Sequence, residues 1–163
     1  MKNLIIITAR LESTRLPNKP LADINGESMI AHVYKRAKEA NIAHVIVAAG
    51  NVEIKELIEN IGGEAILTNS NHESGSDRIF EALNIYDKES KFDNIINLQG
   101  DLPNIHKDAL SKIVSLLESS NADISTLGVK ISSEEEFLNP NIVKADVKNI
   151  SESNYVDDFD RRF

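Results

Sequence analysis

The sequence predicts an α/β fold built on a mostly parallel sheet, and two patterns carry that prediction. Short apolar runs rich in β-branched residues recur along the chain, which is typical of strands buried on both faces. Amphipathic stretches with helical spacing lie between these runs, and strict alternation of strand and helix indicates right-handed crossovers and parallel pairing. Ligands of such sheets bind at the carboxyl ends of the strands, so a site is expected in the segments that follow them.

Five segments are predicted as buried strands because each is a short, mainly apolar run. They are residues 4–8 (LIIIT), 44–49 (HVIVAA), 64–68 (EAILT), 94–98 (NIINL) and 123–129 (DISTLGV). Four intervening segments are predicted as helices from the spacing of their apolar residues. They are residues 28–40, 51–63, 76–86 and 107–120. In the second helix, Asn51 is expected to cap the N-terminus and Gly62 to stop the helix.

Length and composition indicate one soluble globular domain over residues 1–163, with 41% hydrophobic and 27% charged residues. The formal net charge of -8 argues against nucleic-acid or anionic-membrane partners, because either would need a broad basic face. The chain has no cysteine, which excludes disulfides and thiolate metal sites. No apolar run approaches the roughly 20 residues of a membrane span, and the N-terminal run is too short for a signal peptide. A cytoplasmic location is therefore expected.

A basic loop, residues 9–21 (ARLESTRLPNKPL), leaves the carboxyl end of the first predicted strand. Arg10, Arg15 and Lys19 stand there against a single acid, Glu12, in a chain that is acidic overall. Two arginine forks and a lysine point charge suit a polyphosphate ligand. The loop is neither a Walker A motif nor a GxGxxG motif, which disfavours an ordinary P-loop ATPase or nicotinamide-binding fold. The alternative interpretation is a solvated basic loop.

A single carboxylate follows the fourth predicted strand, in the stretch NLQGDLP (97–103). Gly100 permits a tight turn or the close approach of a ligand, and Asp101 is expected near the basic loop. A lone aspartate beside a polyphosphate is a natural Mg²⁺ ligand, because that ion is held by one or two carboxylates and phosphate oxygens. The alternative is a strand-end turn in which Asp101 caps the next segment.

A third polar stretch, NHESGSDRI (71–79), lies between the third predicted strand and its helix. Three small residues can offer backbone N–H groups and hydroxyls to an anion: Ser74, Gly75 and Ser76. Ser76 or Asp77 is expected to cap the helix, and Arg78 is expected to face either ligand or solvent. The four histidines are scattered without metal-ligand spacing, which disfavours a zinc site.

Four ordered motifs resemble those of the 3-deoxy-manno-octulosonate (KDO) cytidylyltransferases, also called CMP-KDO synthetases. They are ITARLESTRLPNKPLADINGESMIAHV, NHESGSDRI, NLQGDLP and LNPNIVKA, which together extend over nearly the whole chain. A related spore-coat polysaccharide group shares S-T-R-L-P-x-K but lacks the SGSDR and NPNIVK stretches, and CMP-sialate synthetases have a different first loop. The resemblance implies a Rossmann-like nucleotidyltransferase fold and the reaction CTP + KDO → CMP-KDO + pyrophosphate, in lipopolysaccharide biosynthesis.

The resemblance also implies roles for individual residues. Arg10, Arg15 and Lys19 would hold the CTP phosphates and offset the charge on pyrophosphate, while the anomeric hydroxyl of the sugar attacks the α-phosphate. Asp101 would bind Mg²⁺, which polarises the α-phosphate and helps to activate the hydroxyl. The nucleotide and sugar pocket would be lined by Ala9, Ser74, Gly75, Arg78 and Gln99.

Three departures from the family pattern stand out. Leu102 replaces the glutamate of the usual Gln-Gly-Asp-Glu-Pro, and Gly50 and Asn51 follow the second predicted strand where the family usually has Ala-Thr-Asp. Family members also continue well beyond the equivalent of Phe163. That further part normally carries a second metal-binding aspartate, much of the KDO site and the segments of the homodimer. The fold is therefore expected to be incomplete at its C-terminus.

Three functional hypotheses follow from these observations. The favoured one is a KDO cytidylyltransferase domain with its CTP half-site intact, weakly active or inactive as this chain alone. The alternatives are cytidylyl transfer to another acidic or amino sugar, and a catalytically inactive CTP-binding protein that acts through a partner. The absent second aspartate favours the inactive protein, whereas the retained cations and Asp101 oppose it. Assays with other acceptor sugars, and CTP affinity measured beside pyrophosphate release, separate the three.

Overall fold

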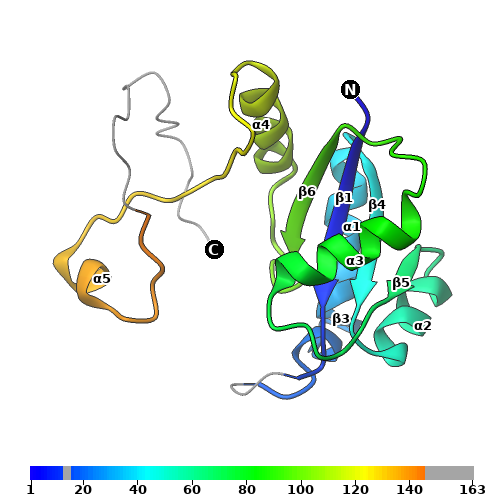
Figure 1. Cartoon of the computed structure of the whole chain (residues 1–163). Helices are drawn as coiled ribbons and strands as arrows, with labels where there is room; N and C mark the ends of the chain where they lie inside the picture. Colours follow the sequence, from blue (N-terminus) through cyan, green and yellow to red (C-terminus); the bar gives the residue numbers. More distant parts are fainter. Residues whose placement is uncertain (13–15, 146–163) are drawn as a thin grey trace.

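The computed structural model describes residues 1–12 and 16–145, and its body is a four-stranded parallel sheet in the order β5-β4-β1-β6 (Figure 1). The strands are β1 (Asn3–Ala9), β4 (His44–Ala49), β5 (Ala65–Leu67) and β6 (Asn94–Gln99). Four of the five predicted strands are thus confirmed within one residue of their expected bounds. The α/β prediction with a mostly parallel sheet is confirmed with them.

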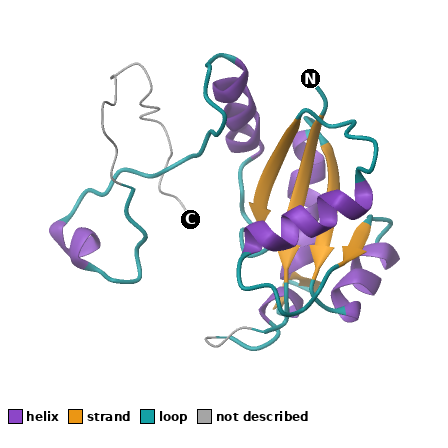
Figure 2. Cartoon of the chain, viewed as in Figure 1, coloured by secondary structure: helices purple, strands orange, loops and turns teal. Residues whose placement is uncertain are grey.

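Helices cover both faces of this sheet (Figure 2). One face carries α1 (Met29–Ala40) and α2 (Val52–Asn60), with α4 (Lys107–Glu118) beside α1, and the other face carries α3 (Gly75–Tyr86). Side chains alternate along β1, so that Ile5 and Ile7 pack on the α1 side while Leu4 and Ile6 pack on the α3 side. The central strand is therefore buried on both faces, as its continuous apolar sequence predicts.

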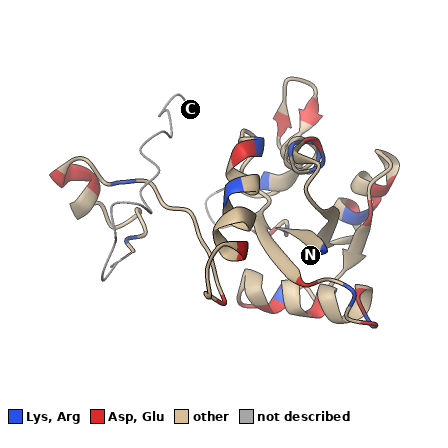
Figure 3. Cartoon of the chain, turned by 90° about the horizontal axis from the view of Figure 1, so that it is seen from above, with Lys and Arg blue, Asp and Glu red and all other residues tan. Residues whose placement is uncertain are grey.

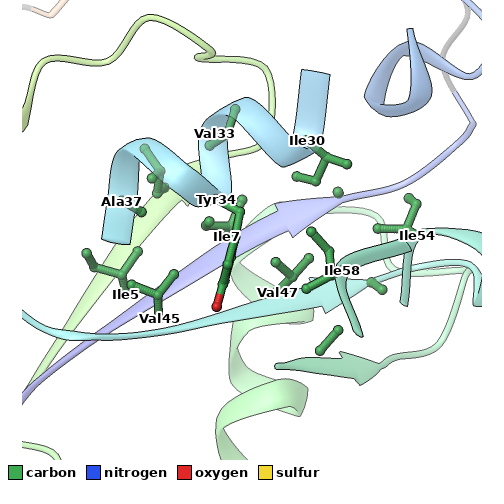
Figure 4. Close-up of a cluster of buried hydrophobic side chains, with 14 of the residues drawn as sticks. Ile5, Ile7, Ile30, Val33, Tyr34, Ala37, Val45, Val47, Ile54 and Ile58 are labelled. Carbon is green, nitrogen blue, oxygen red and sulfur yellow. The ribbon is translucent and has the colours of Figure 1, made fainter. Parts of the chain in front are cut away.

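The larger core lies between the sheet and helices α1 and α2 (Figure 4). Its labelled members come from two strands and two helices: Ile5, Ile7, Val45, Val47, Ile30, Val33, Tyr34, Ala37, Ile54 and Ile58. All are buried, and most have no exposed surface. Because burial of one such aliphatic side chain stabilises the fold by about 1.5–3 kcal/mol, this layer holds the carboxyl ends of the strands in a fixed arrangement.

Helix α2 ends where the sequence predicts, at a glycine in the left-handed region. Gly62 has a φ of 79°, and its N–H donates to the carbonyl of Glu59 at 3.0 Å. The N–H of Gly63 donates to the carbonyl of Ile58 at 2.8 Å, which completes a Schellman motif. The last carbonyls of α2 are thereby satisfied before the chain enters β5.

Between β1 and α1 the chain forms a short 3₁₀-helix, η1 (Lys19–Leu21), and a two-stranded hairpin of β2 (Asp23–Ile24) and β3 (Glu27–Ser28). Neither element is predicted from the apolar pattern, since both are too short to show a period. Ser28 ends the hairpin and caps α1, accepting the N–H of Ala31 at 3.4 Å. The chain therefore passes from the basic loop through the hairpin directly into α1, which packs against η1.

Residues 122–145 leave the body of the fold (Figure 1). The strand predicted at 123–129 is wrong, because this segment has irregular structure, with Ile124 83% and Val129 69% exposed. A short helix, α5 (Glu134–Leu138), follows it. Alternation of apolar residues makes a strand only beside another strand, and among the described residues none pairs with this segment. No helix within the described part of the chain is both long and apolar enough to cross a bilayer.

Candidate functional site

The polar segments singled out in the sequence follow β1, β4, β5 and β6, and so belong to one edge of the sheet. The strand order reverses at β1, because β4 and β5 lie on one side of it and β6 on the other. In open α/β sheets, ligands bind at the carboxyl ends of the two strands that flank such a reversal. Here those ends are Ala9 of β1 and Gln99 of β6.

Lys19 and Asp101 come together at this edge, although 82 positions separate them in the sequence. The Nζ of Lys19, in η1, lies 2.6 Å from Oδ2 of Asp101, in the turn after β6. The two side chains are 34% and 47% exposed, so the pair contributes at most about 1 kcal/mol and separates easily. The predicted approach of the basic loop to this carboxylate is confirmed.

Gly100 sets the position of Asp101. Its N–H donates to the carbonyl oxygen of Thr8 at 3.0 Å and so continues the ladder between β1 and β6. A Cβ atom at position 100 would lie 2.6 Å from the same oxygen. That oxygen belongs to the central strand and cannot move aside, so a larger residue would displace the turn and with it Asp101.

Asn51 anchors the start of the basic loop. It is the N-cap residue of α2, as predicted, but its side chain makes no capping hydrogen bond to the helix. Its Oδ1 instead accepts the N–H of Leu11 at 2.9 Å, and its Nδ2 donates to Oε1 of Glu12 at 2.9 Å. The hydrogen bond from Asn51 is the largest cause that lowers the pKa of Glu12. The residue departs from the usual family motif, and in this chain it ties the loop to the end of β4.

Arg10 is an exposed cation at this edge. Its Nη1 donates to the carbonyl oxygen of His72 at 3.1 Å, which joins the basic loop to the segment before α3. Arg15, the second arginine of the loop, lies outside the described residues, so its role stays a prediction. Elsewhere on the body, Lys and Arg are interspersed with Asp and Glu over the helices (Figure 3).

Ser74, and neither Ser76 nor Asp77, is the N-cap residue of α3. The Oγ of Ser74 accepts the N–H of Asp77 at 3.1 Å and donates its own proton to Oδ2 of Asp77 at 2.7 Å. Asp77 therefore stands three residues after the cap and is bonded to the capping hydroxyl through both its N–H and its carboxylate. The sequence offers two serines of equal chemistry here, so composition alone does not select between them.

The first turn of α3 lies against the ends of β1 and β6. A Cβ at Gly75 would be 3.6 Å from both the Nε2 of Gln99 and the Oγ1 of Thr8, which is ordinary van der Waals distance. The free N–H groups and partial positive charge of a helix N-terminus favour an anion. The structure thus brings Gly75 beside Gln99 and Thr8, and the use of Ala9, Ser74, Gly75 and Gln99 as one pocket stays a prediction.

Arg78 is a buried cation, with 2% of its surface exposed. Its Nη1 donates to Oγ1 of Thr68 at 2.6 Å and to the carbonyl of Asn69 at 3.1 Å, while Nη2 donates to the carbonyl of Ser70 at 3.4 Å. Burial, and secondly the positive charge of the basic loop, lowers the pKa of Arg78. The guanidinium fills space left by Gly50, where a Cβ would lie 2.8 Å from Nη1. It therefore faces the segment after β5 instead of solvent.

Where the basic loop meets β6, the described residues place the carboxylate of Asp101. The described residues contain no group of three or more His, Cys, Asp or Glu side chains that could hold a metal ion. A cation bound by Asp101 would therefore take its other ligands from phosphate oxygens and water. Mg²⁺ binds in this way, so the donor set at this edge fits that ion.

Comparison with known proteins places this geometry in a family, because residues 4–162 match the cytidylyltransferases. The chain belongs to the cytidylyltransferase family. It is 51% identical over 144 residues to the 3-deoxy-manno-octulosonate cytidylyltransferases of Brucella suis and Brucella melitensis, and 50% identical to that of Chelativorans sp.. These matches cover 88% of this chain and 57% of each relative, so the chain spans just over half the length of these curated relatives.

Solved structures agree with this assignment. The chain is similar to a CMP:2-keto-3-deoxy-manno-octonic acid synthetase complexed with CTP, with a TM-score of 0.68 and 40% identity over 75% of this chain and 49% of that one. A cytidylyltransferase from Leptospira borgpetersenii follows, with a TM-score of 0.62 and 26% identity over 75% of this chain and 51% of that one. The predicted nucleotidyltransferase fold is confirmed.

Proposed function

We propose that this chain supplies the CTP-binding part of a KDO cytidylyltransferase. That enzyme transfers a cytidylyl group from CTP to the anomeric hydroxyl of KDO and releases pyrophosphate. The meeting of Lys19 with Asp101, where β1 and β6 flank the reversal of strand order, carries the proposal. The chain is 51% identical to enzymes of this name, which supports CTP as the nucleotide and KDO as the sugar. The lipopolysaccharide pathway, the cytoplasmic location and dimer formation stay predictions.

The cations of the basic loop have a direct role in this reaction. Arg10, Lys19 and Arg15 hold the phosphates of CTP and offset the negative charge that develops on the leaving pyrophosphate. The surface pair between Lys19 and Asp101 separates when the nucleotide arrives, because a triphosphate attracts Lys19 more strongly than one exposed carboxylate does. Lys19 then contacts the phosphates, and the carboxylate of Asp101 is released for a cation.

The residues around the N-terminus of α3 hold the rest of the nucleotide. Ser74, Gly75, Ala9 and Gln99 lie at the ends of α3, β1 and β6 and line the pocket for CTP. Asp101, together with the phosphates, would hold Mg²⁺, which would supply Lewis-acid polarisation of the α-phosphate. In-line attack is then a matter of position and charge, which this rigid edge provides.

The test is pyrophosphate release from CTP and KDO with Mg²⁺, measured for the wild type, Asp101→Asn and Asp123→Asn. Asp123 is exposed in the segment after α4 and serves as the matched control. We expect Asp101→Asn to lower the rate by about 10²–10³-fold, the usual effect of losing one group that stabilises transition-state charge. Asp123→Asn should leave the rate unchanged.

Other outcomes of this assay are informative. Magnesium-dependent CTP binding without pyrophosphate release, measured by calorimetry, would support the inactive CTP-binding protein instead. Release with another acidic or amino sugar but not with KDO would change the acceptor. CTP binding that is equally tight in Asp101→Asn, with and without Mg²⁺, would contradict the proposed site.

A further inference from the structure

Helix α3 holds the segment 68–72 through a buried donor. Arg78 donates to three atoms of this segment: the hydroxyl of Thr68 and the carbonyls of Asn69 and Ser70. Removing a guanidinium from water is costly, and hydrogen bonds to its N–H groups offset that cost. Since all three acceptors belong to three consecutive residues, the buried cation determines where the backbone of that segment runs.

The same helix holds the segment through an acceptor. Glu81 lies one turn after Arg78, on the same side of α3. Its Oε2 accepts the N–H of Asn69 at 2.9 Å and also contacts the Nε2 of His72. Arg78 thus satisfies the carbonyls of the segment, and Glu81 satisfies an N–H and the imidazole.

The held segment ends at the carbonyl that receives Arg10. The Nη1 of Arg10 donates to the oxygen of His72, whose ring is held by Glu81. At its other end the segment is tied to β4, because the N–H and the hydroxyl of Thr68 both donate to the carbonyl of Ala49, at 2.8 and 2.9 Å. A continuous series of contacts therefore runs from α3 through residues 68–72 to an exposed cation of the basic loop.

We infer that Arg78 and Glu81 are positioning residues, which act through residues 68–72 to hold Arg10 toward the phosphates of the nucleotide. The inference rests on the proposed function only for the identity of that nucleotide. Arg78 acts indirectly, because its guanidinium is buried and bonded to the segment. The role of Glu81 is the sharper claim, since an acid would support the binding of an anion.

Simple electrostatics and positioning predict opposite changes in nucleotide affinity when Glu81 is replaced, so an affinity measurement tests this role. Removal of a negative charge near a triphosphate strengthens its binding if charge alone matters. If Glu81 positions Arg10, Glu81→Met weakens the affinity for Mg²⁺·CTP instead, by about 2- to 30-fold, the range usual for residues coupled through contacts. Glu56→Met, on the exposed face of α2, removes the same charge as the matched control and should not weaken binding.

A double-mutant cycle tests whether the effect passes through Arg10. Arg78→Met alone and Arg10→Ala alone each weaken binding, but the double variant should be no weaker than Arg10→Ala. Arg78→Lys should rescue only in part, because an ammonium cannot reproduce the planar fork of a guanidinium. Tighter binding by Glu81→Met, or full additivity in the cycle, would overturn the inference.

A measurement without nucleotide keeps this inference separate from the proposed function. Hydrogen exchange followed by NMR should show that Glu81→Met loses protection at the amide of Asn69 and broadens the side-chain signals of Arg10. If the wild type binds no CTP but these changes occur, the proposed function fails and the positioning network stands. If CTP binds and Glu81→Met leaves both signals unchanged, the network is wrong and the function stands.

Discussion

Strand β1 and the stretch 123–129 have similar apolar sequence patterns but different structures. Ile6 of β1 has no exposed surface, whereas Ile124 in the stretch DISTLGV is 83% exposed. β1 is paired along its length with β4 on one side and β6 on the other, while the described residues place no strand beside 123–129. An apolar, β-branched run therefore predicts a strand only when a partner edge is within reach.

The largest expected difference in stability between the two regions comes from the same substitution made once in β1 and once in the stretch 123–129. Ile6→Ala should lower the free energy of unfolding by about 2–5 kcal/mol, because it removes buried contacts and leaves a cavity. Ile124→Ala should change it by less than about 0.5 kcal/mol. Urea denaturation of both variants checks the difference. A loss above about 1 kcal/mol for Ile124→Ala would mean that 123–129 is packed in solution.

A pair of glycines gives the next largest effect. Gly100→Ala places a methyl group 2.6 Å from a backbone oxygen of β1 and should destabilise the fold by about 1–3 kcal/mol. Gly128→Ala meets nothing within 4 Å and should be neutral or stabilising by up to about 1 kcal/mol. Thermal melts compare the two, and CTP affinity shows whether Asp101 moves with Gly100. Equal melting temperatures for the two variants would contradict this packing.

The smallest expected effect on stability comes from the polar contacts at the sheet edge, which contribute less than the apolar layers. The hydrogen bond with His72, and then the one from Asn69, lower the pKa of Glu81 below its ordinary value of 4.5. This contribution is present above pH 4.5 and is lost as the pH falls through the lower folded-state pKa. The wild type should therefore exceed Glu81→Met in stability by under about 1 kcal/mol at pH 7.

Below the folded-state pKa of Glu81 that advantage should disappear. Melts of the wild type and Glu81→Met across this pH range check the sign. An advantage that grows as the pH falls would contradict the assigned hydrogen bonds.

Most of the sheet could be predicted from the sequence, because buried parallel strands leave continuous apolar runs such as LIII in β1. The approach of Lys19 to Asp101 could also be predicted, since parallel strands bring their carboxyl ends to one edge. The strand at 123–129 could not be judged from its own pattern. Its outcome depends on whether an edge is available to pair with it.

The directions of the polar side chains were beyond prediction for a different reason. The burial of Arg78 depends on the space at Gly50 and on acceptors in residues 68–70. Neither of these can be deduced from the spacing of apolar residues within one helix or strand. The side chain of Asn51 could bond either to the N-terminus of α2 or to the basic loop. It bonds to the loop, because tertiary structure places the N–H of Leu11 within its reach. The one usable signal was that Arg78 and Glu81 lie three positions apart, on one side of α3.

The central position of β1 has a consequence for synthesis on the ribosome. Of the four strands, β1 is synthesised first, and it needs neighbours on both sides. Its second neighbour, β6, ends only at Gln99. At a translation rate of about 5–20 residues per second, the apolar β1 stays without that neighbour for roughly five to twenty seconds. During this interval the nascent chain is open to chaperones and to aggregation, so slower translation before residue 99 should lower the yield of folded protein.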